Sequence, residues 1–247
     1  MSFYEQIAPY YDYIFPAGQD QCTYIKELAG KPPKKLLDIA CGTGVYSIEL
    51  AREGYEVWAT DVDTEMVRRA EKSASDKNIS IKTLVSDMLN LDKHMDEKFH
   101  CVFCIGNSIV HLGSKEAILA AVLQMKERLS PGGSLLLQII NFDRIFQKGI
   151  TSLPTIVNEN VGLEFQRNYV SDPINGLIHF DTILTIKDGN REDRYENRVD
   201  LFPVLSSDFR EILDCAGFES ISFYGGFNKE PYITGESFML VANATVI

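Results

Sequence analysis

Between residues 34 and 140, short apolar segments alternate with helix-forming segments, and this alternation constrains the fold of the 247-residue chain most. The apolar segments carry few charges, as strands covered on both faces do. They are residues 34–40, 55–60, 79–85, 100–105 and 134–140. Helices are expected from the first turn to Arg52, over 64–75 and over 115–129. Strands that alternate with helices form βαβ units, so the sequence predicts a doubly wound, mostly parallel sheet.

After Asn141 the pattern changes to the two-residue alternation of half-exposed antiparallel strands. Three such strands, "GLEFQRNYV", "LIHFDTILTI" and "YENRVDLF", predict an insertion of about 60 residues. A helix with a serine N-cap, "SSDFREILDCAGF", follows. The last two strands are joined too closely for a crossover helix, so we expect them to pair antiparallel.

The complete prediction is an α/β fold with seven strands in the main sheet, the last one antiparallel, and a small antiparallel β insertion that forms a lid. Residues 34–141 and 206–247 would form the α/β domain, and 142–205 the lid. Residues 1–33 would form a helical lid segment that is rich in tyrosine.

The turn after the first strand, "DIACGTG", predicts where a ligand binds. In open α/β sheets, ligands bind beyond the carboxyl ends of the strands. Ala40, Gly42 and Gly44 leave the backbone bare, so that a ligand can approach the amides that begin the next helix. Asp61 ends the second strand, 19 residues after Gly42, where it can accept hydrogen bonds from both ribose hydroxyls. At this point NAD and S-adenosylmethionine both fit.

Three features separate the two cofactors. Ser47 stands where the dinucleotide pattern requires its third glycine. Asp87 and Met88 follow the third strand, where the carboxylate would accept from an adenine amine and the Met88 amide would donate to a ring nitrogen. The antiparallel closing strand also fits a methyltransferase sheet better than a dinucleotide-binding one.

Together, "LLDIACGTG", "TDVD", "SDML" and "CIGNSIVHL" resemble the motifs of class I S-adenosylmethionine-dependent methyltransferases. The resemblance implies that S-adenosylmethionine is the methyl donor, that S-adenosylhomocysteine is the product and that no metal takes part. It also implies tyrosines of the N-terminal segment closing over the cofactor. The implied cofactor contacts are Tyr4, Tyr11, Asp38, Ala40, Gly42, Gly44, Asp61, Val62, Met66, Asp87, Met88, Ile105 and Asn107.

Within that superfamily, "CIGNSIVHL", "PGGSLLLQIINFDRI" and "GGFNKEPY" are similar to the glycine N-methyltransferase group. That group binds the glycine carboxylate with an arginine just before an Asn-Tyr-Asp motif. Here Ile140 precedes Asn141-Phe142-Asp143, so Arg144 or Arg167 would have to replace the missing arginine. The candidate substrate-binding residues are therefore Asn141, Arg144 and Arg167.

Asn107 and His111 are the candidate catalytic residues, because they follow the fourth strand at the same sheet edge. Methyl transfer from a sulfonium requires alignment more than a nucleophile or a metal. No His-Asp or Lys-Asp pair stands out as a base for a hydroxyl acceptor, which favours a small amine. An NAD-dependent oxidoreductase and a non-catalytic cofactor-binding module remain as alternatives.

Each candidate also has a purely structural interpretation. An aspartate can cap a helix, although Asp63 fits that role better than Asp61. Asn107 can bond loop backbone, and His111 can be a packing residue. Cys101 and Cys104 lie in an apolar strand and are expected to be core residues rather than a redox pair. The arginines of 191–198 are expected on a solvated face.

The net charge of −11 disfavours a nucleic-acid partner, since an acidic surface repels phosphates. The chain shows no signal-peptide pattern and no apolar run of membrane-spanning length, so no membrane association is expected. Five cysteines at irregular spacing are typical of free thiols in the cytoplasm. The oligomeric state cannot be inferred from these features.

Overall fold

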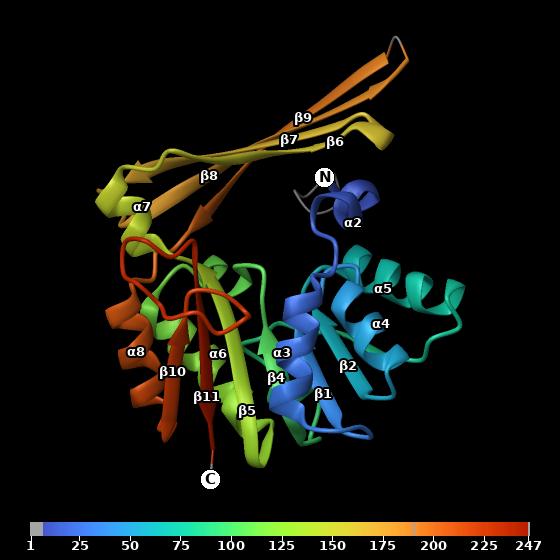
Figure 1. The fold of residues 1–247 in the computed structure, drawn as a ribbon, viewed down its shortest axis with the longest axis vertical. Helices are drawn as coiled ribbons and strands as arrows, with labels where there is room; N and C mark the ends of the chain where they lie inside the picture. Colours follow the sequence, from blue (N-terminus) through green and yellow to red (C-terminus); the bar gives the residue numbers. More distant parts are fainter. Residues whose placement is uncertain (1–6, 190, 247) are drawn as a thin grey trace.

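The main sheet has seven strands in the order β10-β11-β5-β4-β1-β2-β3, in a computed structural model that describes residues 7–189 and 191–246 (Figure 1). The strands are parallel except β11, which runs antiparallel to both neighbours, as the sequence predicted. Their bounds are β1 (Lys35–Ile39), β2 (Glu56–Asp61), β3 (Lys82–Val85), β4 (Phe99–Cys104), β5 (Leu129–Ile140), β10 (Ser220–Tyr224) and β11 (Met239–Thr245).

Helices cover both faces of this sheet, because successive strand residues point to opposite sides. Leu36 belongs to the core cluster beneath α3 and α4, whereas Leu37 belongs to the cluster beneath α6 and α8. Cys101 and Cys104 are likewise in different clusters and fully buried, so these thiols are core residues. The helices are α3 (Gln19–Ala29), α4 (Val45–Arg52), α5 (Thr64–Asp76), α6 (Lys115–Glu127) and α8 (Ser206–Cys215).

The insertion is a second sheet of four antiparallel strands, not the three that the sequence predicted. Its strands are β6 (Ser152–Asn158), β7 (Leu163–Asp172), β8 (Leu177–Asp188) and β9 (Arg191–Leu201). The first strand was missed because Pro154 interrupts its pattern, and its pairing with β7 shifts register between Leu153 and Ile156. A short helix, α7 (Phe142–Lys148), precedes this sheet and was also missed.

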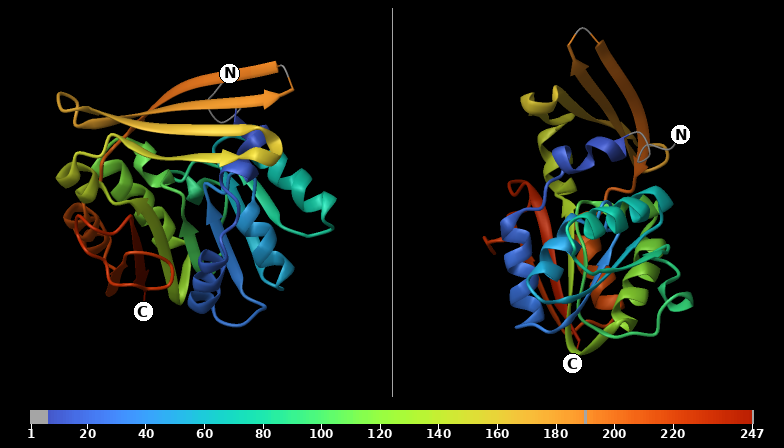
Figure 2. Two further views of the ribbon diagram at one scale, coloured as in Figure 1. Left: turned by 45° about the horizontal axis from the view of Figure 1, so that its top comes forward. Right: turned by 90° about the vertical axis from the view of Figure 1, so that its right-hand side faces the viewer.

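The lid sheet, as we call β6–β9, lies across the carboxyl ends of the main parallel strands (Figures 1 and 2). The short helices η1 (Ala8–Tyr10) and α2 (Tyr11–Ile14) lie between the two sheets. Ile7 and Ile14 pack there against lid residues such as Phe165. The third helix of the N-terminal segment, α3, instead covers the main sheet.

Helix ends are fixed by carboxylates and amides. The Asp63 side chain caps α5 by accepting from the amides of Glu65 and Met66, as expected. The expected serine cap of α8 is wrong, because the N-cap residue is Leu205. Instead, the backbone N–H of Ser206 donates to Asp143 Oδ2 on α7 at 2.8 Å, which ties α8 to the lid connection. The remaining short helices are η2 (Leu91–Lys93), η3 (Ser108–Leu112) and η4 (Glu159–Val161).

Candidate functional site

The turn between β1 and α4 has the bare, left-handed backbone that its sequence indicated. Ala40, Gly42 and Gly44 have φ values of 57°, 56° and 77°. A Cβ on Gly44 would lie 2.9 Å from Ala70 Cβ, and one on Gly42 would lie 3.0 Å from the Tyr11 ring. The turn is therefore closely covered by α5 on one side and by α2 on the other, and glycine is required at both positions.

Asp61 ends β2 beside this turn. Its Oδ2 accepts from the Gly42 N–H at 2.8 Å and its Oδ1 from the Asp63 N–H at 3.0 Å. Burial raises the pKa of the Asp61 carboxyl above its ordinary value. Each carboxylate oxygen has a second lone pair, so the fixed side chain can still accept from two hydroxyls. The cap of α5 is supplied by Asp63, so the helix-cap interpretation does not apply to Asp61.

A cavity of about 220 Å³ extends from Asp61 across the ends of β2 and β3. It brings together Tyr11, Ala40, Gly42, Asp61, Val62, Met66, Asp87 and Met88, all expected as cofactor contacts. The Val62 side chain is 69% exposed, an apolar surface available to a planar base. Asp87 Oδ1 accepts from the Leu89 N–H at 2.9 Å, which fixes that carboxylate at the rim.

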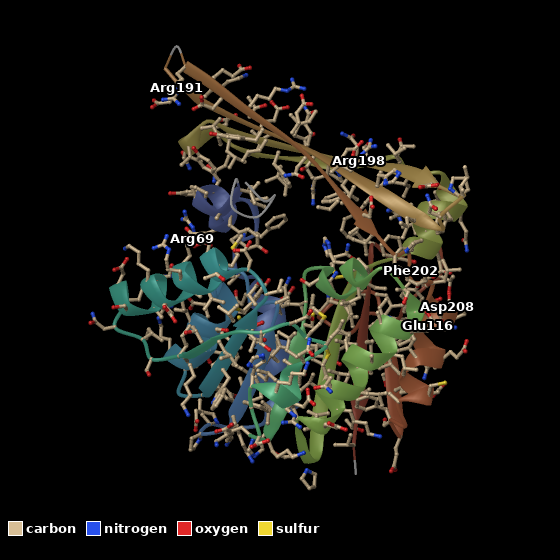
Figure 3. The ribbon with its side chains drawn as sticks, turned by 180° about the vertical axis from the view of Figure 1, so that it is seen from behind. Arg69, Glu116, Arg191, Arg198, Phe202 and Asp208 are labelled. Carbon is tan, nitrogen blue, oxygen red and sulfur yellow. The ribbon has the colours of Figure 1, made fainter. Side chains whose placement is uncertain are left out.

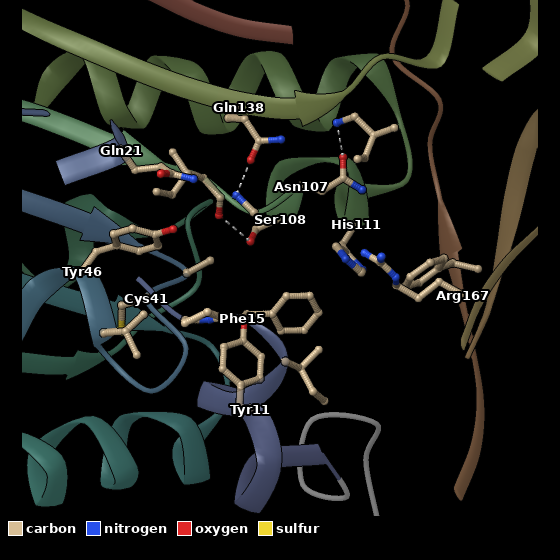
Figure 4. A pocket seen from close by; sticks show the side chains of 18 of the residues that line it. Tyr11, Phe15, Gln21, Cys41, Tyr46, Asn107, Ser108, His111, Gln138 and Arg167 are labelled. Carbon is tan, nitrogen blue, oxygen red and sulfur yellow. Dashed lines mark hydrogen bonds between the residues drawn. The ribbon is translucent and has the colours of Figure 1, made fainter. Parts of the chain in front are cut away.

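A second cavity, of about 380 Å³, lies between the main sheet and the lid sheet (Figure 4). Tyr11, Ala40, Ser108 and His111 line both cavities, so the two adjoin. Asp38 and Ile105, also expected as cofactor contacts, line the larger one. Asp38 is buried, accepts from Ser47 Oγ at 2.6 Å, and has its pKa raised to about 7 by burial. Tyr4 lies outside the described residues.

Asn107 and His111 follow β4 and line the larger cavity, as Figure 4 shows. Asn107 has a left-handed backbone with φ 69°, and its Oδ1 accepts from the Ile140 N–H at 2.9 Å. The Asn107 side-chain oxygen therefore bonds to backbone, as the structural interpretation of this residue expected. His111 lies on η3, and burial lowers the pKa of its imidazole, which favours the neutral ring at pH 7.

Of the three candidate substrate residues, only Arg167 lines the cavity. It projects from β7 of the lid sheet toward His111 (Figure 4). Its Nη2 donates to the Pro154 carbonyl at 2.6 Å, while its buried Nε has no hydrogen-bond partner among the described residues. Burial lowers the pKa of the guanidinium, which still remains charged.

Asn141 and Arg144 are placed elsewhere. The Asn141 side chain is buried and caps α7, its Oδ1 accepting from the Arg144 N–H at 3.2 Å and from Tyr232 Oη at 2.8 Å. Its Nδ2 donates to the Ser237 carbonyl. The Arg144 guanidinium lies 5.8 Å from the centre of the Phe238 ring. Asn141 therefore joins α7 to the C-terminal loop instead of facing the cavity.

Several lining residues had not been singled out from the sequence. Gln138 is one that could have been found, because it is a polar residue inside the apolar run "SLLLQII". Its Oε1 accepts from the Gly106 N–H at 2.7 Å, which fixes the loop before Asn107. The other residues come from α3, α4, the loop between β10 and β11, and the lid sheet, and no local sequence pattern reveals that these elements meet at one cavity. These residues are Gln21, Tyr46, Leu153, Tyr169, Phe180, Leu201 and Phe227.

The lid arginines of β9 lie away from the cavity. Arg198 forms two bonds to the Asp181 carboxylate, at 2.6 and 2.7 Å, and Arg191 pairs with Asp193 (Figure 3). Within residues 7–189 and 191–246, we find no group of three or more side chains able to hold a metal ion. Over the same ranges, no helix is long and apolar enough to cross a membrane.

Residues 36–133 match the family model described as "Methyltransferase domain". A glycine/sarcosine N-methyltransferase of Aphanothece halophytica is 31% identical over 212 residues, which cover 83% of this chain and 74% of that protein. The chain belongs to the class I S-adenosylmethionine-dependent methyltransferases. This assignment confirms the cofactor and the enzyme class expected from the sequence, and it rejects both the NAD-dependent oxidoreductase and the non-catalytic module.

The chain is also similar to the glycine N-methyltransferase of Mus musculus, with 34% identity over 126 residues, which cover 47% of this chain and 43% of that protein. A methyltransferase of Clostridium acetobutylicum has the same fold, with a TM-score of 0.83 over 99% of both chains at 15% identity. An amino pentose methyltransferase of Micromonospora echinaspora gives 0.71 over 98% of both chains at 19% identity. These structural similarities establish the fold, lid sheet included.

Proposed function

We propose that this enzyme methylates the nitrogen of a small amine that carries a carboxylate, in the cavity beneath the lid sheet. The observation that carries the proposal is Arg167, a half-buried cation that faces His111 across that cavity and whose buried Nε has no hydrogen-bond partner among the described residues. A carboxylate is the natural partner of a guanidinium. The glycine/sarcosine N-methyltransferases among the relatives act, by their names, on such amino acids.

The turn and the two acids suit the donor. In our proposal, the bare backbone of Gly42 lets the donor approach the turn, Asp61 accepts from the donor's ribose, and Asp38 faces its amino group. When bound, S-adenosylmethionine supplies a methyl group whose C–S bond breaks as a C–N bond forms, the sulfur keeping the electron pair. Tyr11 lines both cavities and places an aromatic face beside the turn, which is favourable for a cation.

In this proposal His111 orients the acceptor amine by a hydrogen bond. An amine reaches the enzyme largely as an ammonium ion and must lose a proton before its lone pair can react. The lowered pKa of His111 keeps its imidazole neutral at pH 7, so that one ring nitrogen can accept a hydrogen bond from the amine. The Asn107 loop, held by Gln138 and the Ile140 amide, fixes the end of β4 beside that histidine.

The test compares Arg167→Gln with Arg198→Gln. The second variant also removes a lid arginine, but one that pairs with Asp181 outside the cavity. Glycine, sarcosine, leucine and phenylalanine are screened by release of S-adenosylhomocysteine. For the best acceptor, Arg167→Gln should raise KM by about 30-fold or more, because it removes one partner of a buried charge pair. The Kd of S-adenosylmethionine should not change.

Arg198→Gln should leave both constants near their original values. An unchanged acceptor KM in Arg167→Gln would contradict the carboxylate assignment. Release of S-adenosylhomocysteine with none of the four amino acids would contradict the amine assignment.

A further inference from the structure

The lid surface around Arg167 is apolar. Leu153, Tyr169, Phe180 and Leu201 line the cavity from four different lid strands, and Ile140 lines it from the main sheet. Leu153 pairs with Arg167 in the sheet register, and Tyr169 pairs with Phe180. The Tyr169 and Phe180 rings lie 5.4 Å apart between centroids, as a tilted pair. The guanidinium is thus set into a hydrocarbon and aromatic wall.

This wall excludes some acceptors. A hydroxyl group placed against Leu153, Phe180 or Leu201 would have no hydrogen-bond partner there, and burying it unpaired is costly. The polar lining residues Asn107, Ser108 and Gln138 instead belong to the main-sheet side of the cavity. Among the described lining residues, Arg167 is the one lysine or arginine, so the wall balances a single negative charge. A phosphate dianion would therefore be poorly neutralised, whereas a carboxylate fits.

The carboxylate of glycine would pair with Arg167, but the apolar side chains around Arg167 would remain in contact with water. A side chain on the carbon between the amine and the carboxylate would cover it, and burying an aliphatic or aromatic side chain contributes about 1.5–3 kcal/mol. We propose that the acceptor is an amino acid with an apolar side chain of about the size of leucine or phenylalanine, its carboxylate held by Arg167. This inference rests on the proposed function of the same site.

A kinetic comparison tests the size of the acceptor. Glycine, leucine, phenylalanine and phenethylamine, which lacks the carboxylate, are compared by kcat/KM for release of S-adenosylhomocysteine. We expect leucine or phenylalanine to exceed glycine by about tenfold or more, because each added methylene in an apolar pocket contributes to discrimination. Phenethylamine should be about 30-fold poorer than phenylalanine, since Arg167 loses its partner. A glycine value equal to or above both larger amino acids would overturn the inference.

A binding measurement separates this inference from the proposed function. Calorimetry of 3-phenylpropanoate and acetate is made on the protein saturated with S-adenosylhomocysteine, since these acids have no amine to methylate. Binding of 3-phenylpropanoate at least about tenfold tighter than acetate is expected. Phe180→Ala should weaken it by a similar factor, whereas Val170→Ala, on the exposed side of β7, should not.

The outcomes distinguish the two claims. Tight binding of 3-phenylpropanoate without methylation of any amine supports the apolar carboxylate site and contradicts the proposed nitrogen chemistry. Methylation of glycine with no preference for 3-phenylpropanoate over acetate supports the nitrogen chemistry and overturns the inference. Thermal unfolding of both variants shows whether Phe180→Ala retains the native fold.

Discussion

At the scale of single residues, two carboxylates lie at the proposed donor end of the site, Asp38 buried and Asp61 half-buried. Asp38 is fixed by Ser47, and Asp61 by two backbone amides. Burial raises the pKa of both side chains, because a charge is poorly solvated inside the protein. A ligand that brings a positive charge or hydroxyl donors to these carboxylates compensates for the lost solvation. In the proposed function, S-adenosylmethionine supplies both, through its ammonium group and its ribose hydroxyls.

The raised pKa of Asp38 predicts pH-dependent cofactor affinity. With a pKa of about 7 in the free protein, Asp38 is increasingly protonated as the pH falls below 7 and must lose its proton to pair with an ammonium. The Kd of S-adenosylmethionine should therefore rise as pH falls, by up to about tenfold per pH unit. Calorimetry across this range should show the slope in the original protein and a flat profile in Asp38→Asn.

The same group affects folding stability with a definite sign. An unfolded aspartate has a pKa of about 3.9, so between that value and about 7 the folded state holds a proton that the unfolded state has lost. The free energy of unfolding of the cofactor-free protein should therefore decrease as the pH rises through this window. A slope that persists unchanged in Asp38→Asn would contradict this origin.

Replacing Asp61 by asparagine should weaken cofactor binding. The change keeps one acceptor oxygen but removes the charge, so affinity for S-adenosylmethionine should fall by about 10- to 100-fold. Glu56→Gln is the matched control, because Glu56 begins the same strand and is paired with Lys82 on the surface. Equal affinities of the two variants in calorimetry would contradict the role of Asp61.

At the scale of elements, the β1–α4 turn is constrained by backbone conformation and by the packing of α5. Gly44→Ala adds a methyl group to a left-handed residue, 2.9 Å from Ala70 Cβ. Gly176 is left-handed too, but a Cβ there meets nothing within 4 Å. We expect Gly44→Ala to lower the free energy of unfolding by about 3 kcal/mol and Gly176→Ala by about 1 kcal/mol. Equal losses in denaturant unfolding would show that the contact with Ala70 costs nothing.

The contact between α2 and the same turn is a second element-scale feature. Thr43 Oγ1 donates to the Asp12 carboxylate, which ties α2 to the β1–α4 turn. Thr43→Val and Asp12→Ala should each speed cofactor release by about three- to tenfold, and the double variant should be no worse than either. Thr83→Val removes a comparable hydroxyl bond, to Glu71 on the surface, and should leave release unchanged in stopped-flow traces. Additive effects would contradict a direct contact.

At the scale of the whole molecule, the main sheet could be predicted and the lid only in part. Apolar strands and amphipathic helices are local patterns, so the seven strands and the antiparallel end were accessible from the sequence. The strand around Pro154 was not, because its pairing partners lie beyond the local pattern. The cap of α8 was misassigned for a related reason: Asp143, which takes that role, is 63 residues away along the chain.

The candidate site was likewise predicted only in part from the sequence. The expected cofactor residues at the ends of β1 and β2 come from short motifs, and, with the exception of Gly44, they line two adjoining cavities. The acceptor end depends on how the lid sheet lies over the main sheet. Sequence reasoning therefore gave Arg144 and Arg167 as equal candidates, while in the folded chain Arg167 lines the cavity and Arg144 lies beside Phe238.

The most direct test of the central claim is the position of the transferred methyl group. The protein is incubated with S-adenosylmethionine and the panel of amino acids, and the products are identified by mass spectrometry and NMR. We predict a methyl group on the amine nitrogen, formed in equal amount with S-adenosylhomocysteine. A methyl group on a carboxylate oxygen, or S-adenosylhomocysteine formed without any methylated amine, would contradict the proposed function.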